Sequence, residues 1–243
     1  MPHRLETLPH PAIIAHRGAS RYAPENTLTA FQLALEQGAD GLEFDVRLSA
    51  DGYPVVFHDA TVRHRTNGQG WVAKLPLAEL QKLDAGNGER IPTLEQVLEA
   101  VGGKTLLNIE LKPILRHTHL LSEKVVEAVK RYRLEESVLF SSFSVPALKV
   151  MAHLAPDIPR GLLLPGGFLP ARLAAWVGRS LTYQTLHPDF HDVLGGVFPG
   201  DRYPARHIFT YTVNDEVDMR RLFQLGVNIF TDDTPLAQRI RGF

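Results

Sequence analysis

The sequence predicts an α/β protein, and within that class a (β/α)8 barrel of the TIM type. Two observations support the prediction. Short apolar segments recur along the chain, and each is followed by a stretch of helical character, as expected for a parallel sheet covered by helices. The chain has 243 residues, close to the usual length of one such barrel. Two smaller domains would fit the same length, so the prediction depends mainly on the alternation.

The first four strand candidates are apolar or alternate between apolar and polar residues, as buried or half-buried strands do. They are Ala12–His16, Gly41–Leu48, Thr105–Lys112 and Val138–Ser142. The helix candidates that follow them are Thr27–Gln37, Thr93–Val101, His119–Tyr132 and Val145–His153. We interpret Pro24-Glu25-Asn26-Thr27 as a loop that ends in an N-cap before Leu28, and we assign it a structural role.

The second half of the chain repeats the pattern less regularly. Its strand candidates are Gly161–Leu164, Leu181–Leu186, His207–Val213 and Val227–Thr231. Its helix candidates are Leu169–Gly178, Asp189–Val197, Glu216–Gln224 and Pro235–Arg241. The run Pro165-Gly166-Gly167 makes the boundaries of the fifth and sixth units the least defined. Because each strand has about the length of a barrel stave, a closed barrel is favoured over an open doubly wound sheet.

One segment interrupts the alternation. Between His58 and Pro92, turn-forming residues dominate around a short helical stretch at Leu77–Leu83. Long insertions in barrels commonly lie over the catalytic mouth, so we predict a small cap-like insertion at about residues 59–92, after the second strand region. The whole chain, residues 1–243, is then a single catalytic barrel domain.

The composition is that of an ordinary folded protein, with 44% hydrophobic and 22% charged residues. Lys and Arg number 26 against 27 Asp and Glu, so no overall charge favours nucleic acid or an anionic membrane. The absence of cysteine excludes disulfides, thiolate metal ligands and a cysteine nucleophile. Neither a signal peptide nor a stretch of roughly 20 apolar residues is found, which predicts a cytoplasmic protein without a membrane span. The sequence leaves the oligomeric state open.

Acidic side chains gather on two strand candidates. Side chains alternate between the faces of a strand, so Glu43 and Asp45 share one face, and Glu110 shares a face with Lys112. In a barrel these faces look into the mouth, where three carboxylates would repel one another unless they were protonated or a cation neutralised them. Oxygen ligands favour Mg²⁺ or Ca²⁺, and a histidine within reach leaves Mn²⁺ or zinc open. Surface charges on an edge strand are less favoured, because apolar residues occupy the opposite face.

Two histidines stand in matching places. His16 and His58 each follow a short apolar run, which puts both at the ends of what we expect to be neighbouring strands. Alone, either would more often be a core or exposed residue than a catalyst. Their paired placement favours general acid and base roles, because imidazole exchanges protons near neutral pH.

Two cationic residues accompany these groups. Arg17 offers a planar pair of donors to a phosphoryl oxygen, and Lys112 offers a point charge. Both could instead be ion-pair partners of the acids, although that role is compatible with substrate contact. Together the residues indicate metal-assisted cleavage of a phosphate ester.

At this point the chain resembles the glycerophosphodiester phosphodiesterase family. The matching segments are Ala15-His16-Arg17-Gly18, Pro24-Glu25-Asn26-Thr27, Gly41-Leu42-Glu43-Phe44-Asp45-Val46, Asp51-Gly52, Pro54-Val55-Val56-Phe57-His58-Asp59, Arg65-Thr66-Asn67-Gly68, Glu110-Leu111-Lys112, Tyr211-Thr212-Val213-Asn214 and Thr231-Asp232. They span nearly the whole chain in the family's order, which makes the resemblance specific.

The resemblance implies a metal-dependent enzyme that hydrolyses glycerophosphodiesters to glycerol 3-phosphate and an alcohol. The residues that it assigns are Glu43, Asp45 and Glu110 for the cation, His16 and His58 for acid-base catalysis, and Arg17 and Lys112 for the phosphate. Two positions depart from the family pattern. Tyr211 stands where Trp is usual, which bears on the lining of the glycerol or alcohol pocket, and Asn228 stands where Asp is common, which bears on packing.

Two other functions stay open from the sequence. The first is a related barrel phosphodiesterase that acts on a lysophospholipid or sphingolipid head group by lyase chemistry, and an exposed apolar rim at the mouth would favour it. The second is a non-catalytic phosphate- or metal-binding module, since a fold does not fix a function. The second is disfavoured, because both histidines and all three carboxylates are present.

Overall fold

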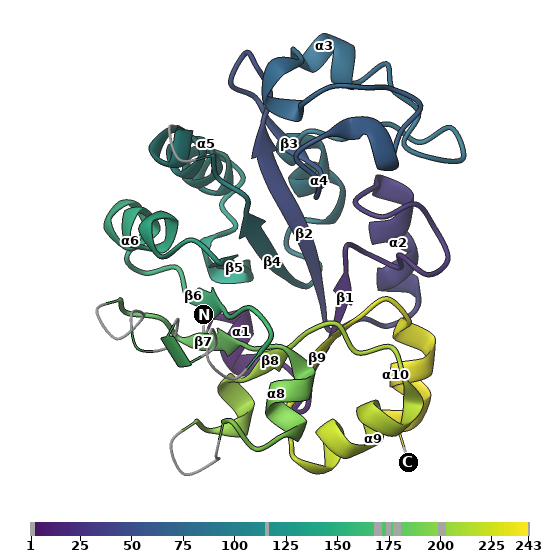
Figure 1. Cartoon of the computed structure of the whole chain (residues 1–243), viewed down its shortest axis with the longest axis vertical. Helices are drawn as coiled ribbons and strands as arrows, with labels where there is room; N and C mark the ends of the chain where they lie inside the picture. Colours follow the sequence, from purple (N-terminus) through teal and green to yellow (C-terminus); the bar gives the residue numbers. More distant parts are fainter. Residues whose placement is uncertain are drawn as a thin grey trace.

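The computed structural model describes residues 3–114, 117–167, 172–173, 176, 181–198 and 203–242. Within these residues nine strands form one sheet, in the order β7-β6-β5-β4-β2-β1-β9-β8, with β3 paired to β2 outside this path. A parallel bridge between Leu186 and Ile208 connects β7 to β8 and brings the two ends of the path together. Figure 1 shows helices around the outside of this ring. The predicted (β/α)8 barrel is therefore confirmed.

The strands are short, as barrel staves are. They are β1 (Ile13–His16), β2 (Gly41–Leu48), β3 (Pro54–Val56), β4 (Leu106–Leu111), β5 (Val138–Ser142), β6 (Arg160–Leu163), β7 (Thr185–His187), β8 (Phe209–Thr210) and β9 (Asn228–Thr231). Along the path every pair is parallel, and only β3 runs antiparallel to its partner.

The helices alternate with the parallel strands. They are α1 (Arg4–Thr7), α2 (Leu28–Glu36), α3 (Leu77–Leu80), α4 (Leu94–Val101), α5 (Thr118–Arg131), α6 (Val145–Leu154), α8 (Phe190–Leu194), α9 (Glu216–Gln224) and α10 (Thr234–Arg241). Short 3-10 turns are η1 (Val62–His64), η2 (Val72–Lys74), η4 (Glu135–Ser137) and η5 (Ala205–His207). None of the helices within the described residues has the length and apolar character to cross a membrane.

Several predicted elements in the second half of the chain are wrong in their bounds. The strand expected from Leu181 begins only at Thr185, because the Arg160 side chain donates to the carbonyl of Thr182, at 3.1 Å, in place of a strand ladder. The strand expected at His207–Val213 is reduced to β8. The helix expected at Asp189–Val197 is reduced to α8, which ends at Leu194 with Gly195 as its C-cap.

Other differences are additions. The sequence did not predict α1, and the eight predicted strands did not include β3. The helical stretch expected at Leu77–Leu83 ends at Leu80. The predicted helix Leu169–Gly178 lies for the most part outside the described residues, so it stays a prediction.

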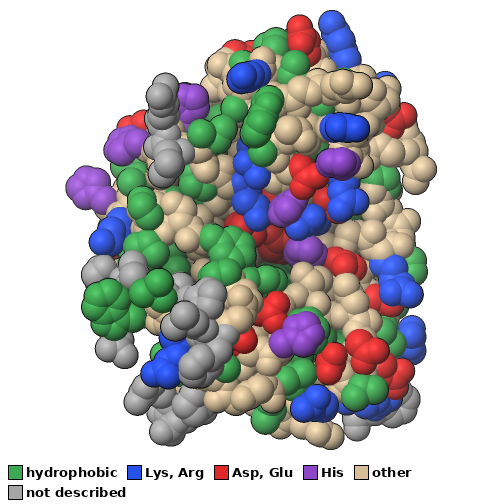
Figure 2. Space-filling view, viewed as in Figure 1, with side chains coloured by type: hydrophobic (Ala, Val, Ile, Leu, Met, Phe, Trp, Pro, Cys, Tyr) green, Lys and Arg blue, Asp and Glu red, His purple; other side chains and the backbone are tan. Residues whose placement is uncertain are grey.

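The segment after β3 folds around a small apolar cluster of its own. The cluster consists of Val55, Phe57, Val62, Val72, Leu80 and Ile91. Figure 1 shows this segment, with α3, as a lobe beyond the end of β2. The face in view is hollowed near its centre, where acidic, basic and histidine side chains gather in Figure 2.

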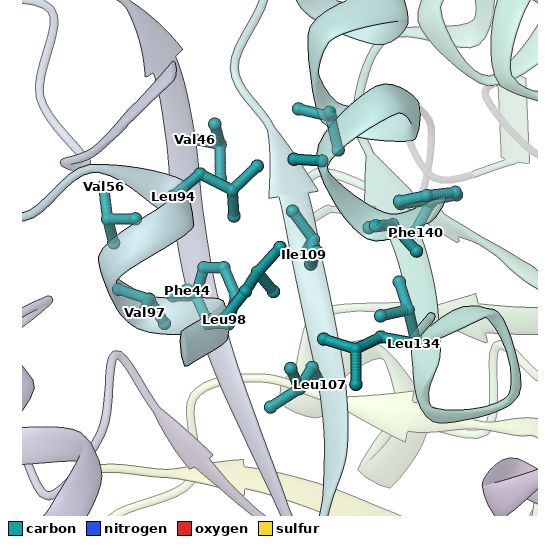
Figure 3. Close-up of a cluster of buried hydrophobic side chains, with 14 of the residues drawn as sticks. Phe44, Val46, Val56, Leu94, Val97, Leu98, Leu107, Ile109, Leu134 and Phe140 are labelled. Carbon is teal, nitrogen blue, oxygen red and sulfur yellow. The ribbon is translucent and has the colours of Figure 1, made fainter. Parts of the chain in front are cut away.

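The barrel is held to its helices by the outward faces of the strands. Phe44 and Val46 of β2 lie in one apolar cluster with Ile109 of β4 and with Leu94 and Leu98 of α4 (Figure 3). Burial of a side chain of this size contributes ~1.5–3 kcal/mol each. The alternation predicted for β2 is confirmed: the apolar residues pack outward, which leaves Glu43 and Asp45 for the interior.

The interior of the barrel contains a fully buried histidine, His187 of β7. Its ring centroid lies 5.6 Å from that of Phe209 and 5.2 Å from that of Phe230, and its Nε2 lies 2.9 Å from the Thr185 hydroxyl. Gly161 of β6 leaves room for the ring, because a Cβ there would lie 2.5 Å from Nε2. Burial lowers the pKa of His187 to about 3.

We expect His187 to make the protein less stable as the pH falls. Its pKa rises on unfolding, so between pH 6.5 and about 3 the unfolded chain binds a proton that the folded chain does not. The free energy of unfolding then falls, with a contribution approaching about 1.4 kcal/mol per pH unit. Denaturant titrations from pH 7 to 5 should show a shallower decline for His187→Gln, while His153→Gln, at an exposed site, should follow the wild type.

Candidate active site

The three predicted carboxylates meet at the mouth of the barrel. Strand register explains this, because Asp45 lies opposite Glu110 in the β2–β4 pair, and Glu43 lies opposite His16 in the β1–β2 pair. One ligand oxygen of each acid lies within 4.8 Å of those of the others. All three are buried, with exposed fractions of 3% for Glu43, 1% for Asp45 and 7% for Glu110.

Arg17 and Lys112 enter the same cluster. Arg17 Nε lies 3.2 Å from Asp45 Oδ2, and Lys112 Nζ lies 3.2 Å from Asp45 Oδ1 and also pairs with Glu110. The backbone N–H of Arg17 donates to Glu43 Oε2 at 3.0 Å. The backbone of Arg17 is in the left-handed region, with φ of 56°, and this orients its N–H toward Glu43. Such a conformation costs of order 1–3 kcal/mol in a non-glycine residue.

The electrostatics of the three acids differ. Burial, reinforced by Asp45 and Glu110, raises the pKa of Glu43 well above its ordinary value. Burial also raises the pKa of Glu110 to about 7, against the opposing effect of Lys112. Burial acts in the same direction on Asp45, but Lys112 and Arg17 outweigh it and hold that pKa below its usual range. When all three acids are ionised, their three negative charges outnumber the two positive charges of Arg17 and Lys112 by one.

The cluster fits a divalent cation. Glu43 Oε1 is buried and therefore removed from water, and no hydrogen bond from the described residues compensates for that loss. The donors are all carboxylate oxygens, which suits a hard ion. These acids are therefore able to hold a metal ion, and the donor set does not identify which one.

Both predicted histidines point into the same region with one ring nitrogen already engaged. His16 Nδ1 lies 2.7 Å from Asp232 Oδ1, and His58 Nδ1 lies 2.7 Å from Asp59 Oδ1. A carboxylate on Nδ1 fixes the ring orientation and leaves Nε2 for other partners. Burial lowers the pKa of His58, and the opposing fields of Asp45 and Asp59 do not restore it.

The expected placement of His58 was wrong in one respect. It does not end a parallel strand next to the strand of His16. It follows β3, which runs antiparallel to β2, and Phe57 N donates to Asp45 O at 2.9 Å. Because β3 is antiparallel to β2, the chain after β3 lies next to Asp45, and this places His58 beside the acids.

The sequence interpretation missed residues that support the site. Asn26, assigned there to structure alone, donates from Nδ2 to Asp45 Oδ2 at 2.9 Å, while Thr27 is the N-cap that was predicted. Asp232 accepts from Ser20 Oγ at 2.8 Å and from Asn214 Nδ2 at 2.6 Å, and these bonds, with His16, lower its pKa to about 2 despite burial. For Asp59, its position directly after His58 was an available signal.

The two departures from the family pattern have different settings. Tyr211 is half-buried at the mouth, and its ring meets that of Phe143 edge-on, with centroids 5.9 Å apart. Asn228 is buried away from the acids, where Oδ1 accepts from Ala12 N at 2.8 Å and Nδ2 donates to Ile208 O at 3.0 Å. Its bonds connect strands, in agreement with the packing role expected for it.

Two hollows lie beside the cluster of acids and cationic residues. One, of about 370 Å³, is lined by Glu110 and Lys112 together with Phe143 and Ser144. The other, of about 530 Å³, is lined by Ser20 and Glu25 and by residues of the insertion. Glu25 belongs to the site as well, since its Oε1 accepts from Arg17 Nη1 at 3.0 Å.

Comparisons with known proteins agree with this geometry. The family model described as glycerophosphoryl diester phosphodiesterase family matches residues 16–236. A glycerophosphodiester phosphodiesterase of Caldanaerobacter subterraneus is 42% identical over 231 residues, 91% of this chain and 93% of the relative. An Oleispira antarctica phosphodiesterase, solved with the product sn-glycerol-3-phosphate, has a TM-score of 0.84 and 33% identity, with 98% of each chain covered. The Thermotoga maritima glycerophosphodiester phosphodiesterase has a TM-score of 0.78 and 27% identity, with 96% of this chain and 99% of that chain covered.

Proposed function

Because the chain belongs to the glycerophosphoryl diester phosphodiesterase family and is a phosphoric diester hydrolase of that type, we propose that it uses a divalent cation and two histidines to release sn-glycerol 3-phosphate and an alcohol. The observation that supports this best is the buried trio of carboxylates with one unpaired oxygen, at the level of both histidines. The Oleispira relative, which was solved with sn-glycerol-3-phosphate, supports the choice of product.

We assign the cation to Glu43, Asp45 and Glu110, with Mg²⁺ or Ca²⁺ as the preferred ion and Mn²⁺ as a further candidate. When bound, the ion supplies a Lewis acid that polarises the phosphodiester and acidifies a hydroxyl group. Arg17 and Lys112 bind the phosphoryl oxygens and stabilise the negative charge that builds there. Their ion pairs with Asp45 hold both groups in place before the substrate arrives.

The two histidines divide the proton transfers. His58 takes the proton of the attacking group, because its lowered pKa keeps the ring neutral at pH 7. That group is a water, or the 2-hydroxyl of the glycerol, in which case a water then opens the cyclic phosphate to give glycerol 3-phosphate. His16 gives a proton to the departing alcohol oxygen, since the Asp232 carboxylate on its Nδ1 fixes the ring and leaves Nε2 for the transfer. Asn26 and Asp59 keep Asp45 and His58 in their orientations. We place the two alcohol arms of the diester in the two hollows beside the acids.

We propose that residues 1–243 act as one catalytic barrel, with the lobe at about residues 59–92 as a cap that supplies His64 and Arg65 to the larger hollow. Arg65 reaches Glu25 at 3.3 Å, so the lobe is connected to Arg17 through that acid. The cytoplasmic location expected from the sequence stays a prediction.

A second substrate class is favoured by one observation. Ile114, Leu120 and Phe143 are exposed by 43%, 40% and 44%, and Phe143 borders the smaller hollow. Such an apolar rim would accommodate the acyl chain of a lysophospholipid. Activity on glycerophosphocholine compared with lysophosphatidylcholine separates the two classes.

We expect release of sn-glycerol 3-phosphate from glycerophosphocholine and glycerophosphoethanolamine to stop in a chelator and to return with Mg²⁺ or Ca²⁺. The reason is that the ion would supply the positive charge that offsets the three buried carboxylates beside the phosphate and polarises the diester. A coupled glycerol 3-phosphate assay measures this. Release that is unchanged in EDTA would remove the cation from the proposal, and the absence of release from any diester would remove the substrate class.

A further inference from the structure

Arg47 lies beside the site, yet the function proposed above gives it no part. It follows Asp45 by two residues on β2, so the two side chains share a face. It also borders the hollow that Glu110 and Lys112 line. Within the described part of the chain, no carboxylate lies at ion-pair distance from its guanidinium.

The guanidinium donates to two backbone carbonyls. Arg47 Nε lies 2.7 Å from the carbonyl oxygen of His58, and Arg47 Nη1 lies 3.5 Å from that of Lys112. These residues belong to segments far apart in the sequence, one after β3 and one after β4. A single planar group thus contacts the main chain of both a proposed proton acceptor and a proposed phosphate ligand.

The two carbonyls lie just beyond the regular pairing of the sheet. The last backbone bonds to β2 are Phe57 N to Asp45 O, at 2.9 Å, and Lys112 N to Val46 O, at 3.0 Å. Among the described residues no backbone N–H donates to the carbonyl of His58 or of Lys112. Arg47 therefore extends the hydrogen bonding of the sheet by one step on both sides, at the place where the site begins.

We propose that Arg47 is a positioning residue, which fixes the backbone of His58 and Lys112 so that the imidazole and the ammonium group keep their separation across the phosphate. The inference depends on the proposed function for the roles of those two residues. The fixed fork of Arg suits the task, since its donors reach two acceptors at once, whereas Lys is a flexible point charge.

Substitutions of Arg47 can separate the effect of its positive charge from that of its planar guanidinium, which contacts two carbonyls at once. We expect Arg47→Gln and Arg47→Lys both to lower kcat by roughly 10²-fold with little change in KM, the loss that misplacement by about 1 Å causes. If Arg47→Lys kept wild-type turnover, the charge alone would be what matters and the proposal would be wrong. The matched control is Arg63→Gln, at an exposed arginine of the lobe, which should leave turnover unchanged.

A double-mutant cycle with His58 gives a readout that a merely structural role would not move. If Arg47 acts through His58 and Lys112, Arg47→Gln should cost clearly less in a His58→Ala background than its roughly 10²-fold loss in the wild type, because only the part carried by Lys112 is left. Two independent losses would instead multiply to roughly 10⁴-fold, and that result would overturn the proposal. Should Arg47→Gln not fold, as judged by circular dichroism and Tm, Arg47→Lys, which keeps the stem, enters the cycle in its place.

The cycle also separates this inference from the function on which it depends. Wild-type turnover in His58→Ala would contradict the role of His58 itself, and with it the proposed function. A large loss in His58→Ala, followed by a full further loss in the double variant, would contradict only the positioning role of Arg47.

Discussion

Replacing Glu43 by alanine is expected to abolish both ion binding and turnover. The three ionised acids exceed Arg17 and Lys112 by one charge, and Glu43→Ala removes that excess together with Glu43 Oε1, a buried oxygen that has no hydrogen-bond partner among the described residues. A loss of several kcal/mol of charge stabilisation corresponds to roughly 10³-fold or more in turnover. Calorimetry with Mg²⁺ and Ca²⁺, together with the glycerol 3-phosphate assay, measures the two effects.

Replacing Glu43 by glutamine should have opposite effects on stability with and without the ion. In chelator, Glu43→Gln should raise Tm, because it removes a buried acid whose pKa is driven up by burial. With the ion present, it should cancel the rise in Tm that the ion gives to the wild type. Glu99→Gln, at an exposed acid of α4, changes the net charge equally and should do neither. Wild-type ion affinity in Glu43→Gln would place the cation elsewhere.

Proton release gives an independent check on the acids. Burial raises the pKa of Glu110 to about 7, so at neutral pH part of the ion-free protein holds a proton there. The ion needs the ionised form, so its binding should release protons and tighten as the pH rises through 7. The calorimetric heat should then depend on the ionisation enthalpy of the buffer.

The part of the site that follows from strand parity was predictable from the sequence. Glu43 and Asp45 are two residues apart on a strand whose other face is apolar, and this local pattern places both in the barrel interior wherever the strand packs. The fold class was predictable for a related reason, because strand and helix periods are read within short windows. The bounds of β2, β5 and α9 were accordingly those expected.

The rest of the site depends on closure of the barrel, which short windows do not contain. Asp232 contacts His16 across 216 positions of sequence, only because β9 pairs with β1. The direction of β3 likewise depends on its pairing with β2. The sequence therefore singled out His58 by its residue type but did not predict the strand arrangement that brings it beside Asp45. The short β7 shows a third cause, since a side chain of β6, Arg160, takes a carbonyl that a strand would have used.

Replacing either histidine by alanine is expected to lower turnover by roughly 10²-fold or more, while ion affinity stays close to that of the wild type. Each ring is held by a carboxylate through Nδ1, His16 by Asp232 and His58 by Asp59, and neither histidine is among the assigned ion ligands. The glycerol 3-phosphate assay and calorimetry on His16→Ala and His58→Ala test both halves of the expectation. If both variants kept wild-type turnover on glycerophosphocholine, the acid-base assignment would be abandoned.

The division of roles between the histidines is testable with a better leaving group. A glycerophosphodiester of p-nitrophenol needs little protonation of its departing oxygen, so His16→Ala should lose far less activity on it than on glycerophosphocholine. His58→Ala should lose a similar factor on both substrates, because the attacking group must still give up its proton. The reverse pattern would exchange the two roles: His58 would be the proton donor, and Asp59 would then outweigh the burial of His58.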